Sequence, residues 1–158
     1  MPNAPLQFSV VAELGGNIDT LNELMTTGPG MEHWVPICRS VKFVHPHGVL
    51  AVGSVRHVTL KIGVKADEHI VFLEAPYKLN YTIGKMGGVV FRNWLLDYEG
   101  VTVLEPVGEN RHRLTWSVHY RLAPSLRLVS PLVRFALHAL IATMVSNICR
   151  VTDGHRVT

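Results

Sequence analysis

Two oppositely charged residues in the middle of the chain are placed to meet inside an otherwise apolar sheet. In a hairpin centred on Ile62, paired residues have numbers that add up to about 124, so Arg56 faces Glu68. Each charge shares its strand face with apolar side chains: Leu50, Val52, Val58 and Leu60 on the first strand, and Val64, Ala66, Ile70 and Phe72 on the second. Because burial of one charge alone costs several kcal/mol, we predict a buried Arg56–Glu68 ion pair.

This ion pair has a structural and a functional interpretation, and both can hold. In the structural one, the pair fixes the register of the sheet. In the functional one, it is a polar anchor in an apolar cavity, where Arg56 binds a carbonyl or carboxylate of a ligand and Glu68 orients the guanidinium.

Inward-facing aromatic residues and one histidine complete the candidate chemistry. Tyr81, Trp116 and Tyr120 either pack in the core or form a wall that recognises a flat or polycyclic ligand. His33 precedes Trp34, where a short helix meets the sheet, and is a candidate general base. The other histidines lack metal-site spacing, and no motif for covalent catalysis or nucleotide binding occurs. We therefore expect neither a metal site nor a cofactor.

The composition indicates a single domain over residues 1–158 with a substantial core. Hydrophobic residues make up 47% and charged residues 17% of 158 residues. The formal net charge is +3, but lysines and arginines do not cluster, so we expect no nucleic-acid partner. The first residues do not resemble a signal peptide, and the apolar stretch 132–149 contains Arg134 and His138, which disfavours a membrane span. These features predict a cytoplasmic protein without integral membrane insertion.

The elements that must position these residues follow from hydrophobic periodicity. Residues 6–14 alternate as a strand, Asn17 can cap a short helix, and residues 31–34 can form another turn of helix. Strands fill residues 37–122, with a bulge near Asp97 and Tyr98 that leaves the faces of both open. A long helix covers residues 124–151, and we place Leu137 and Met144 of its apolar stripe on the cavity wall. The pattern predicts an α+β fold.

This order of elements resembles the START-like (Bet v 1-like) superfamily, in particular its polyketide cyclase/dehydrase and lipid-transport branch. The segments that carry the resemblance are HWVP at 33–36, VGSVRHVTL at 52–60, LEAPYKLNYTI at 73–83, FRNWLLDYEGVTVLEPVG at 91–108 and RLTWSVHY at 113–120. The resemblance implies a helix-grip fold, in which a curved antiparallel sheet of about seven strands wraps the C-terminal helix and encloses a cavity. Matching positions put Trp34, Arg56, Glu68, Tyr81, Trp116 and Tyr120 at the cavity wall.

Three functions stay open at this point. The first is binding of a small hydrophobic molecule, such as a lipid, quinone or polyketide-like compound, by a carrier or sensor. The second is a cofactor-independent cyclase or aromatase in which Arg56 polarises a carbonyl while Tyr81, Glu68 or His33 moves a proton. The third is a homodimeric interaction module that covers the apolar terminal helix.

Overall fold

A computed structural model describes residues 4–26, 31–45, 50–61, 63–87 and 94–157 of the chain, without the side chains of His33 and residues 84–87. The candidate base His33 and residues 91–93 of one motif segment therefore fall outside what is described. The strands are β1 (Leu6–Gly15), β2 (Cys38–Val44), β3 (Val55–Leu60), β4 (Lys65–Glu74), β5 (Lys78–Gly87), β6 (Leu95–Gly108), β7 (Arg111–Leu122) and β8 (His155–Arg156). The helices are α1 (Ile18–Thr26), α2 (Met31–Trp34), the 3₁₀ helix η1 (Pro124–Val129) and α3 (Ser130–Val151).

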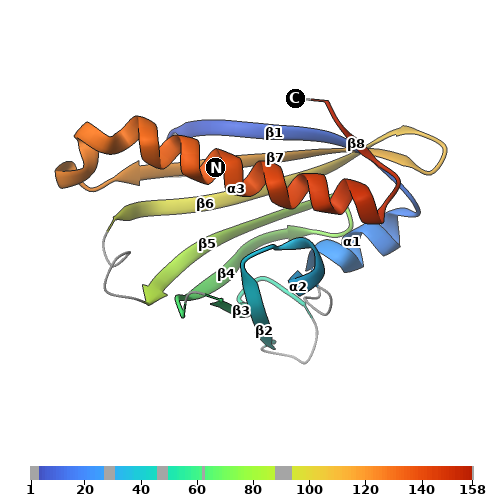
Figure 1. The fold of residues 1–158 in the computed structure, drawn as a ribbon. Coiled ribbons are helices and arrows are strands. Elements are labelled where there is room, and N and C mark those ends of the chain that lie inside the picture. Colours follow the sequence, from blue (N-terminus) through green and yellow to red (C-terminus); the bar gives the residue numbers. More distant parts are fainter. Residues whose placement is uncertain (1–3, 27–30, 46–49, 62, 88–93, 158) are drawn as a thin grey trace.

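The strands form one antiparallel sheet in the order β2-β3-β4-β5-β6-β7-β1-β8. The sheet curves around α3, while α1 and α2 gather near the C-terminal end of that helix (Figure 1). The predicted helix-grip fold is thus confirmed. The prediction of about seven strands missed β8, because its two residues, which pair with Ala12 and Glu13 of β1, are too few to show any periodicity.

The core lies between the concave face of the sheet and the C-terminal half of α3. The fully buried side chains include Val10 and Leu14 of β1, Leu114 of β7, and Val145 and Ile148 of α3. These residues recur every second position in the strands and every three to four positions in the helix, so each element presents one apolar face to the other. This packing fixes the axis of α3 against β1 and β7.

The register of the β3–β4 hairpin agrees with the prediction. Arg56 is paired with Glu68 and Val58 with Ala66, and the amide of Leu60 donates to the carbonyl of Val64. Both charged side chains consequently enter the concave face of the sheet.

Bulges in β4 and β6 change which side chains point inward. In β4 the pairing with β5 shifts between Ile70 and Phe72, and in β6 the pairing with β7 shifts between Leu96 and Glu99. At the second shift Asp97 has φ 53°, in the left-handed region. The bulge predicted near Asp97 is confirmed. One extra residue reverses the in-out alternation of side chains. The sheet face of a residue beyond a bulge therefore cannot be found by counting every second position from the residues before it.

Within the described part of the chain, η1 and α3 together form one helical segment of 28 residues that is long and apolar enough to cross a membrane by length and composition. The core helix of a soluble protein meets the same criterion. Here Ile141, Val145 and Ile148 of the C-terminal half are buried against the sheet, whereas only 22% of the most apolar 18-residue stretch of the segment is buried.

Candidate functional site

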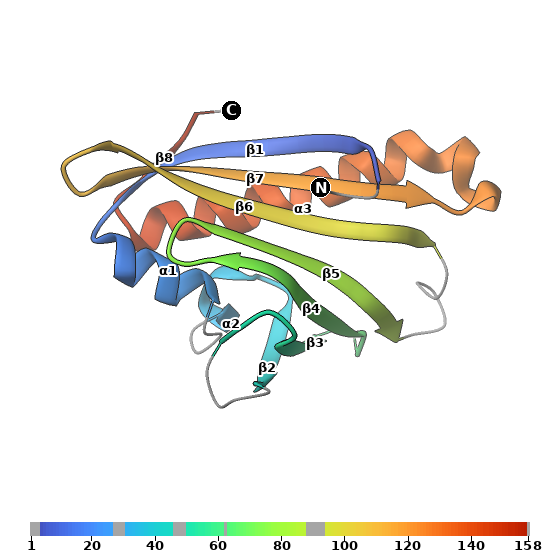
Figure 2. The same cartoon turned by 180° about the vertical axis from the view of Figure 1, so that it is seen from behind.

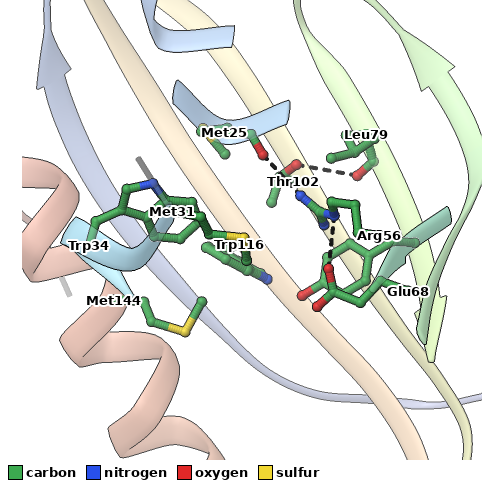
Figure 3. A pocket seen from close by; sticks show the side chains of 10 residues that line it. Met25, Met31, Trp34, Arg56, Glu68, Leu79, Thr102, Trp116 and Met144 are labelled. Carbon is green, nitrogen blue, oxygen red and sulfur yellow. Dashed lines mark hydrogen bonds and ion pairs between the residues drawn. The ribbon is translucent and has the colours of Figure 1, made fainter. Parts of the chain in front are cut away.

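Arg56 is the central polar side chain of the candidate site. It comes from β3, is 3% exposed, and its Nε lies 2.8 Å from Oε2 of Glu68 in the neighbouring strand β4. Its Nη1 donates to the carbonyl of Met25 at 3.1 Å, and its guanidinium lies 5.1 Å from the centre of the Tyr81 ring (Figure 3). Arg56 therefore joins β3, β4 and β5 to the last turn of α1, whose carbonyls lack partners within the helix.

The predicted ion pair is confirmed. Nε of Arg56 and Oε2 of Glu68 lie 2.8 Å apart, and neither atom has another hydrogen-bond partner among the described residues. Their mutual attraction offsets the cost of taking both charges out of water.

The Arg56–Glu68 ion pair lies at the edge of a row of packed aromatic rings. This aromatic wall consists of Trp34, Trp116, Tyr81 and Tyr98. The ring centres of Trp34 and Trp116 are 6.3 Å apart, those of Trp116 and Tyr81 are 6.5 Å apart, and those of Tyr81 and Tyr98 are 6.2 Å apart. Such distances are typical of favourable aromatic pairs. The indole N–H groups of Trp34 and Trp116 have no hydrogen-bond partner among the described residues. The site thus offers hydrogen-bond donors embedded in apolar surface.

These side chains line a small cavity between the sheet and the helices. Its volume is about 20 Å³. The lining residues are Met25, Met31, Trp34, Arg56, Glu68, Leu79, Tyr81, Thr102, Trp116 and Met144. A space of this size holds about one water molecule. In this conformation the cavity is closed, and any larger occupant requires the side chains around it to move.

Both inward-facing tyrosines at the site are neutral phenols at ordinary pH. Burial, and then the neighbouring Tyr98 and Glu68, raise the pKa of Tyr81 well above its usual value, although Arg56 opposes the shift. Burial also raises the pKa of Tyr98. A side-chain hydrogen bond also joins the two phenols, and neither is suited to act as a base near neutral pH.

This burial predicts a loss of stability at alkaline pH. Above pH about 10 the tyrosines ionise in the unfolded chain but stay protonated in the fold, so the unfolded state binds fewer protons. The free energy of unfolding should then fall with rising pH by about 1.4 kcal/mol per pH unit for each of Tyr81 and Tyr98. Urea unfolding at several pH values measures this slope, and Tyr81→Phe should lower it by about 1.4 kcal/mol per pH unit, while the other groups whose pKa burial raises, including Tyr98 and Tyr120, keep their contributions. A slope unchanged by that substitution would show that Tyr81 ionises normally.

Gly100 of β6 makes room for the Tyr81 ring. A Cβ at position 100 would overlap Cζ of Tyr81, far inside van der Waals contact. We predict that Gly100→Ala displaces the Tyr81 ring and lowers the free energy of unfolding by about 1 to 3 kcal/mol. In the background of Tyr81→Leu the same substitution should cost markedly less, and thermal unfolding of the four proteins tests this coupling. Equal costs in both backgrounds would contradict it.

The structure brings most of the predicted site residues together. Arg56, Glu68, Tyr81, Trp34, Trp116 and Met144 all line the cavity. Tyr120 is 1% exposed and inward-facing, but it lies outside the described lining of this cavity, as does Leu137, which is partly buried against the core. Burial raises the pKa of Tyr120, an effect that the nearby charge of Arg134 partly offsets.

The prediction that Phe72 faces the cavity is wrong. Phe72 is 41% exposed, it pairs with Asn80 on the outer face, and Lys78 lies over its ring. The bulge after Ile70 is the cause, because the extra residue moves each later side chain of β4 to the opposite face of the sheet. The cavity also contains Met25, Met31, Leu79 and Thr102, which the sequence prediction did not include. Of these, Leu79 lies two residues from Tyr81 in β5 and Thr102 two residues from Gly100 in β6, so both face the same side of the sheet as Tyr81.

Comparison with known proteins gives one family and several similar folds. The family model for polyketide cyclase/dehydrase and lipid transport matches residues 5–151. No curated protein matches the sequence at a significant level. The protein XoxI from Bacillus cereus is a similar structure, with a TM-score of 0.70 and 16% identity over 92% of this chain and 94% of that chain.

Two further structures have the same fold at low identity. A START superfamily protein from Mycobacterium smegmatis has a TM-score of 0.68 and 10% identity, covering 92% of this chain and 98% of its own. Norcoclaurine synthase from Thalictrum flavum, solved with dopamine and hydroxybenzaldehyde, has a TM-score of 0.65 and 14% identity, covering 91% of this chain and 84% of its own. The family match over nearly the whole chain shows that this protein belongs to the polyketide cyclase/dehydrase and lipid transport family.

Proposed function

We propose that the protein binds one small hydrophobic molecule between its sheet and α3, as a carrier or sensor in the cytoplasm. The observation that carries this proposal is the buried Arg56, held by Glu68 and the Met25 carbonyl at the end of an aromatic wall. A charge at this depth costs free energy, and a packed core does not need it. A ligand that carries a hydrogen-bond acceptor would bind to the guanidinium of Arg56.

The donors around the cavity define the class of occupant. Arg56 and Trp116 offer N–H groups, and Glu68 is the one carboxylate among the described lining residues. Such a site favours an apolar molecule that carries a carbonyl or carboxylate oxygen, as lipids, quinones and polyketide-like compounds do. The flat aromatic wall favours a planar portion next to that oxygen.

The cavity opens by rearranging its methionines. Met25 of α1, Met31 of α2 and Met144 of α3 close it from the helix side, opposite the strands (Figure 3). Methionine side chains are unbranched and adapt to different shapes at low cost. An acceptor on the ligand would also compete with the Met25 carbonyl for Nη1 of Arg56, which frees the end of α1 to move. Binding and opening are thereby coupled through Arg56.

A second candidate function is a cyclase-type enzyme without a cofactor. The contact that favours it is the pairing of a guanidinium, able to polarise a carbonyl, with a carboxylate 2.8 Å away, able to accept a proton. In that case Glu68, rather than the protonated Tyr81, is the base. A carrier binds without turnover, whereas the enzyme converts the bound compound at a rate that Glu68→Gln abolishes.

Native mass spectrometry of freshly purified protein, followed by solvent extraction, tests the proposal. We expect one released hydrophobic molecule per chain from the wild type and none from Arg56→Met/Glu68→Leu, which keeps the cavity volume but removes the polar anchor. Incubation of the released compound with fresh protein then separates carrier from enzyme. Repeated recovery of apo protein that also fails to bind any added lipid, quinone or aromatic ketone would overturn the proposal.

A further inference from the structure

The beginning of the helical segment carries positive charge on the side that faces the sheet. Arg134 precedes Ile141 and Ile148 by seven and fourteen residues, and both isoleucines are buried against the sheet, so the three share one stripe of α3. Arg127 of η1 lines an open groove together with Tyr120 of β7. Both arginines therefore lie where the helical segment meets the end of β7.

The groove lies at the end of the molecule opposite α1 and α2. Figure 1 shows the beginning of the helical segment, in orange, far from these two helices, and Figure 2 shows from behind that β7 runs into it. The groove has a volume of about 330 Å³ and is lined by residues of β1, β7 and the helical segment, among them Gln7, Tyr120, Arg127 and Ser130. The side-chain amide of Gln7 donates to the carbonyl of Tyr120 at 3.0 Å, which joins β1 to β7 at this place.

No carboxylate among the described residues pairs with Arg127 or Arg134. Residues 110–152, which include β7 and the whole helical segment, contain no aspartate or glutamate. Asp97 of β6 is already paired with Arg121, which lines the same groove. The groove and the adjoining turn of α3 therefore carry a net positive charge.

The hydroxyl of Tyr120 is a third polar group without a partner at this place. Tyr120 is 1% exposed, and its hydroxyl makes no hydrogen bond to any described residue. Burial raises the pKa of Tyr120, and the charge of Arg134 opposes that rise, so the guanidinium lies near the phenol. Buried polar side chains in native proteins nearly always have a partner in the protein, a water molecule or a ligand. An anionic oxygen between Arg134 and Tyr120 would accept hydrogen bonds from both.

A row of tyrosines leads from the groove to the cavity beside Arg56. Burial raises the pKa of Tyr98, and Tyr120 is among the neighbours that add to the rise. The ring of Tyr98 in turn lies 6.2 Å from the ring of Tyr81, which lines the cavity. The concave face of the sheet is thus continuous between the two sites, and one elongated ligand can reach both.

The two sites differ in net charge. Arg56 lies 2.8 Å from Glu68, so that pair is neutral overall and suits an uncharged carbonyl oxygen. Arg127 and Arg134 have no such partner among the described residues, and a planar guanidinium matches the paired oxygens of a carboxylate or phosphate group. An anionic group is therefore expected at the groove, and a neutral acceptor beside Arg56.

We propose that Arg127, Arg134 and Tyr120 form a binding site for the anionic end of an amphipathic ligand. The guanidinium groups and the hydroxyl donate to carboxylate or phosphate oxygens, while the apolar body of the ligand extends along the concave face toward Tyr81. This inference rests on the proposed function, because it assigns a charge to the same ligand. It selects amphipathic anions over neutral lipids and quinones.

Isothermal titration calorimetry of the full chain with three ligands tests the proposal. Sodium decanoate, decyl phosphate and decan-1-ol share one apolar chain and differ in the head group. At low salt and about pH 8 we expect decanoate or decyl phosphate to bind at least about tenfold more tightly than the alcohol, and the tighter of the two identifies the head group. About 0.5 M NaCl should reduce this preference by screening the arginines. Equal affinities for all three would overturn the proposal and leave ligand binding itself intact.

Substitutions in the groove show whether these residues bind the anion. Arg134→Gln should lower the affinity for the preferred anion about tenfold and Arg127→Gln about threefold, with far smaller effects on decan-1-ol, and Arg134→Lys should restore part of the loss. Tyr120→Phe should lower the anion affinity about threefold without lowering the melting temperature, because no described partner loses a hydrogen bond. Arg150→Gln, an exposed position at the other end of α3, is the matched control and should bind all three compounds as the wild type does.

Two further outcomes would overturn the proposal. If Arg56→Met/Glu68→Leu removes the preference for the anion and Arg134→Gln does not, the anion binds beside Arg56 instead of in the groove. If none of the three compounds binds, the anion site is wrong, whereas the proposed function is decided separately by the solvent extraction of the purified protein.

Discussion

Arg56→Met is expected to lower the free energy of unfolding by about 3 to 5 kcal/mol, because it leaves the carboxylate of Glu68 unpaired inside the sheet. Both side chains are nearly buried and their ion pair is short, at 2.8 Å. Urea denaturation monitored by circular dichroism measures the effect. The same substitution at Arg121, whose ion pair with Asp97 is exposed, should cost no more than about 1 kcal/mol and is the matched control.

The double variant Arg56→Met/Glu68→Leu should recover most of this loss. An apolar pair of similar volume is often as stable as a buried ion pair, since it avoids the desolvation of both charges. Recovery should be incomplete by about 1 kcal/mol, because the Met25 carbonyl loses its donor. A double variant as unstable as Arg56→Met alone would show that the pair has no special coupling, and would contradict this account of the site.

The double variant also separates the two roles of the pair. A purely structural pair predicts that the stable double variant binds hydrophobic ligands as well as the wild type does. A polar anchor predicts a loss of affinity of at least tenfold, because a hydrogen bond to a charged group contributes about 1.5 to 3 kcal/mol. Fluorescence titration with the extracted ligand distinguishes the two.

Met144→Ala is expected to lower the free energy of unfolding by about 2 to 5 kcal/mol and to open the cavity permanently. Met144 is 6% exposed and lines the cavity from α3, on the side of the two tryptophans (Figure 3). Removing its thioether leaves a space bounded by apolar atoms, which small apolar molecules enter readily. Benzene should therefore raise the melting temperature of the variant, while leaving that of the wild type nearly unchanged.

Thr143→Ala is the matched control for this prediction. Thr143 is the neighbouring residue of α3 but is exposed, so its variant should differ from the wild type by no more than about 0.5 kcal/mol and should not respond to benzene. If Met144→Ala is as stable as the wild type, the cavity wall is not closed by Met144 as the structure indicates.

The strongest sequence predictions concerned strands with uninterrupted alternation. The turn after β3 and the strict parity of both strands were enough to pair Arg56 with Glu68, and this pair in turn located the site. The apolar stripe of residues 124–151 predicted the core helix for the same reason, since a long periodic pattern averages out local exceptions, but it did not separate the 3₁₀ helix η1 from α3.

The missed features have local causes. Phe72 follows the bulge after Ile70, which left no clear mark in the sequence, and Tyr98 lies inside the bulge predicted near Asp97, where strand parity assigns no face. As a result Phe72 points outward, whereas Tyr98 joins the aromatic wall. Met25 and Met31 lie on short helices whose docking angle depends on tertiary contacts, such as the hydrogen bond from Arg56 to the Met25 carbonyl. Periodicity within a short helix does not determine that angle.

The central claim is that a hydrophobic ligand binds beside Arg56 between the sheet and α3, and two-dimensional ¹H–¹⁵N NMR with 1-naphthol as the probe tests it most directly. The chain has three tryptophans, so the spectrum resolves three indole N–H signals. Trp34 and Trp116 line the cavity and Trp94 does not. The account predicts saturable shifts of the Trp34 and Trp116 signals with the Trp94 signal unmoved. Saturable binding that shifts only Trp94, or no saturable shift at all, would contradict it.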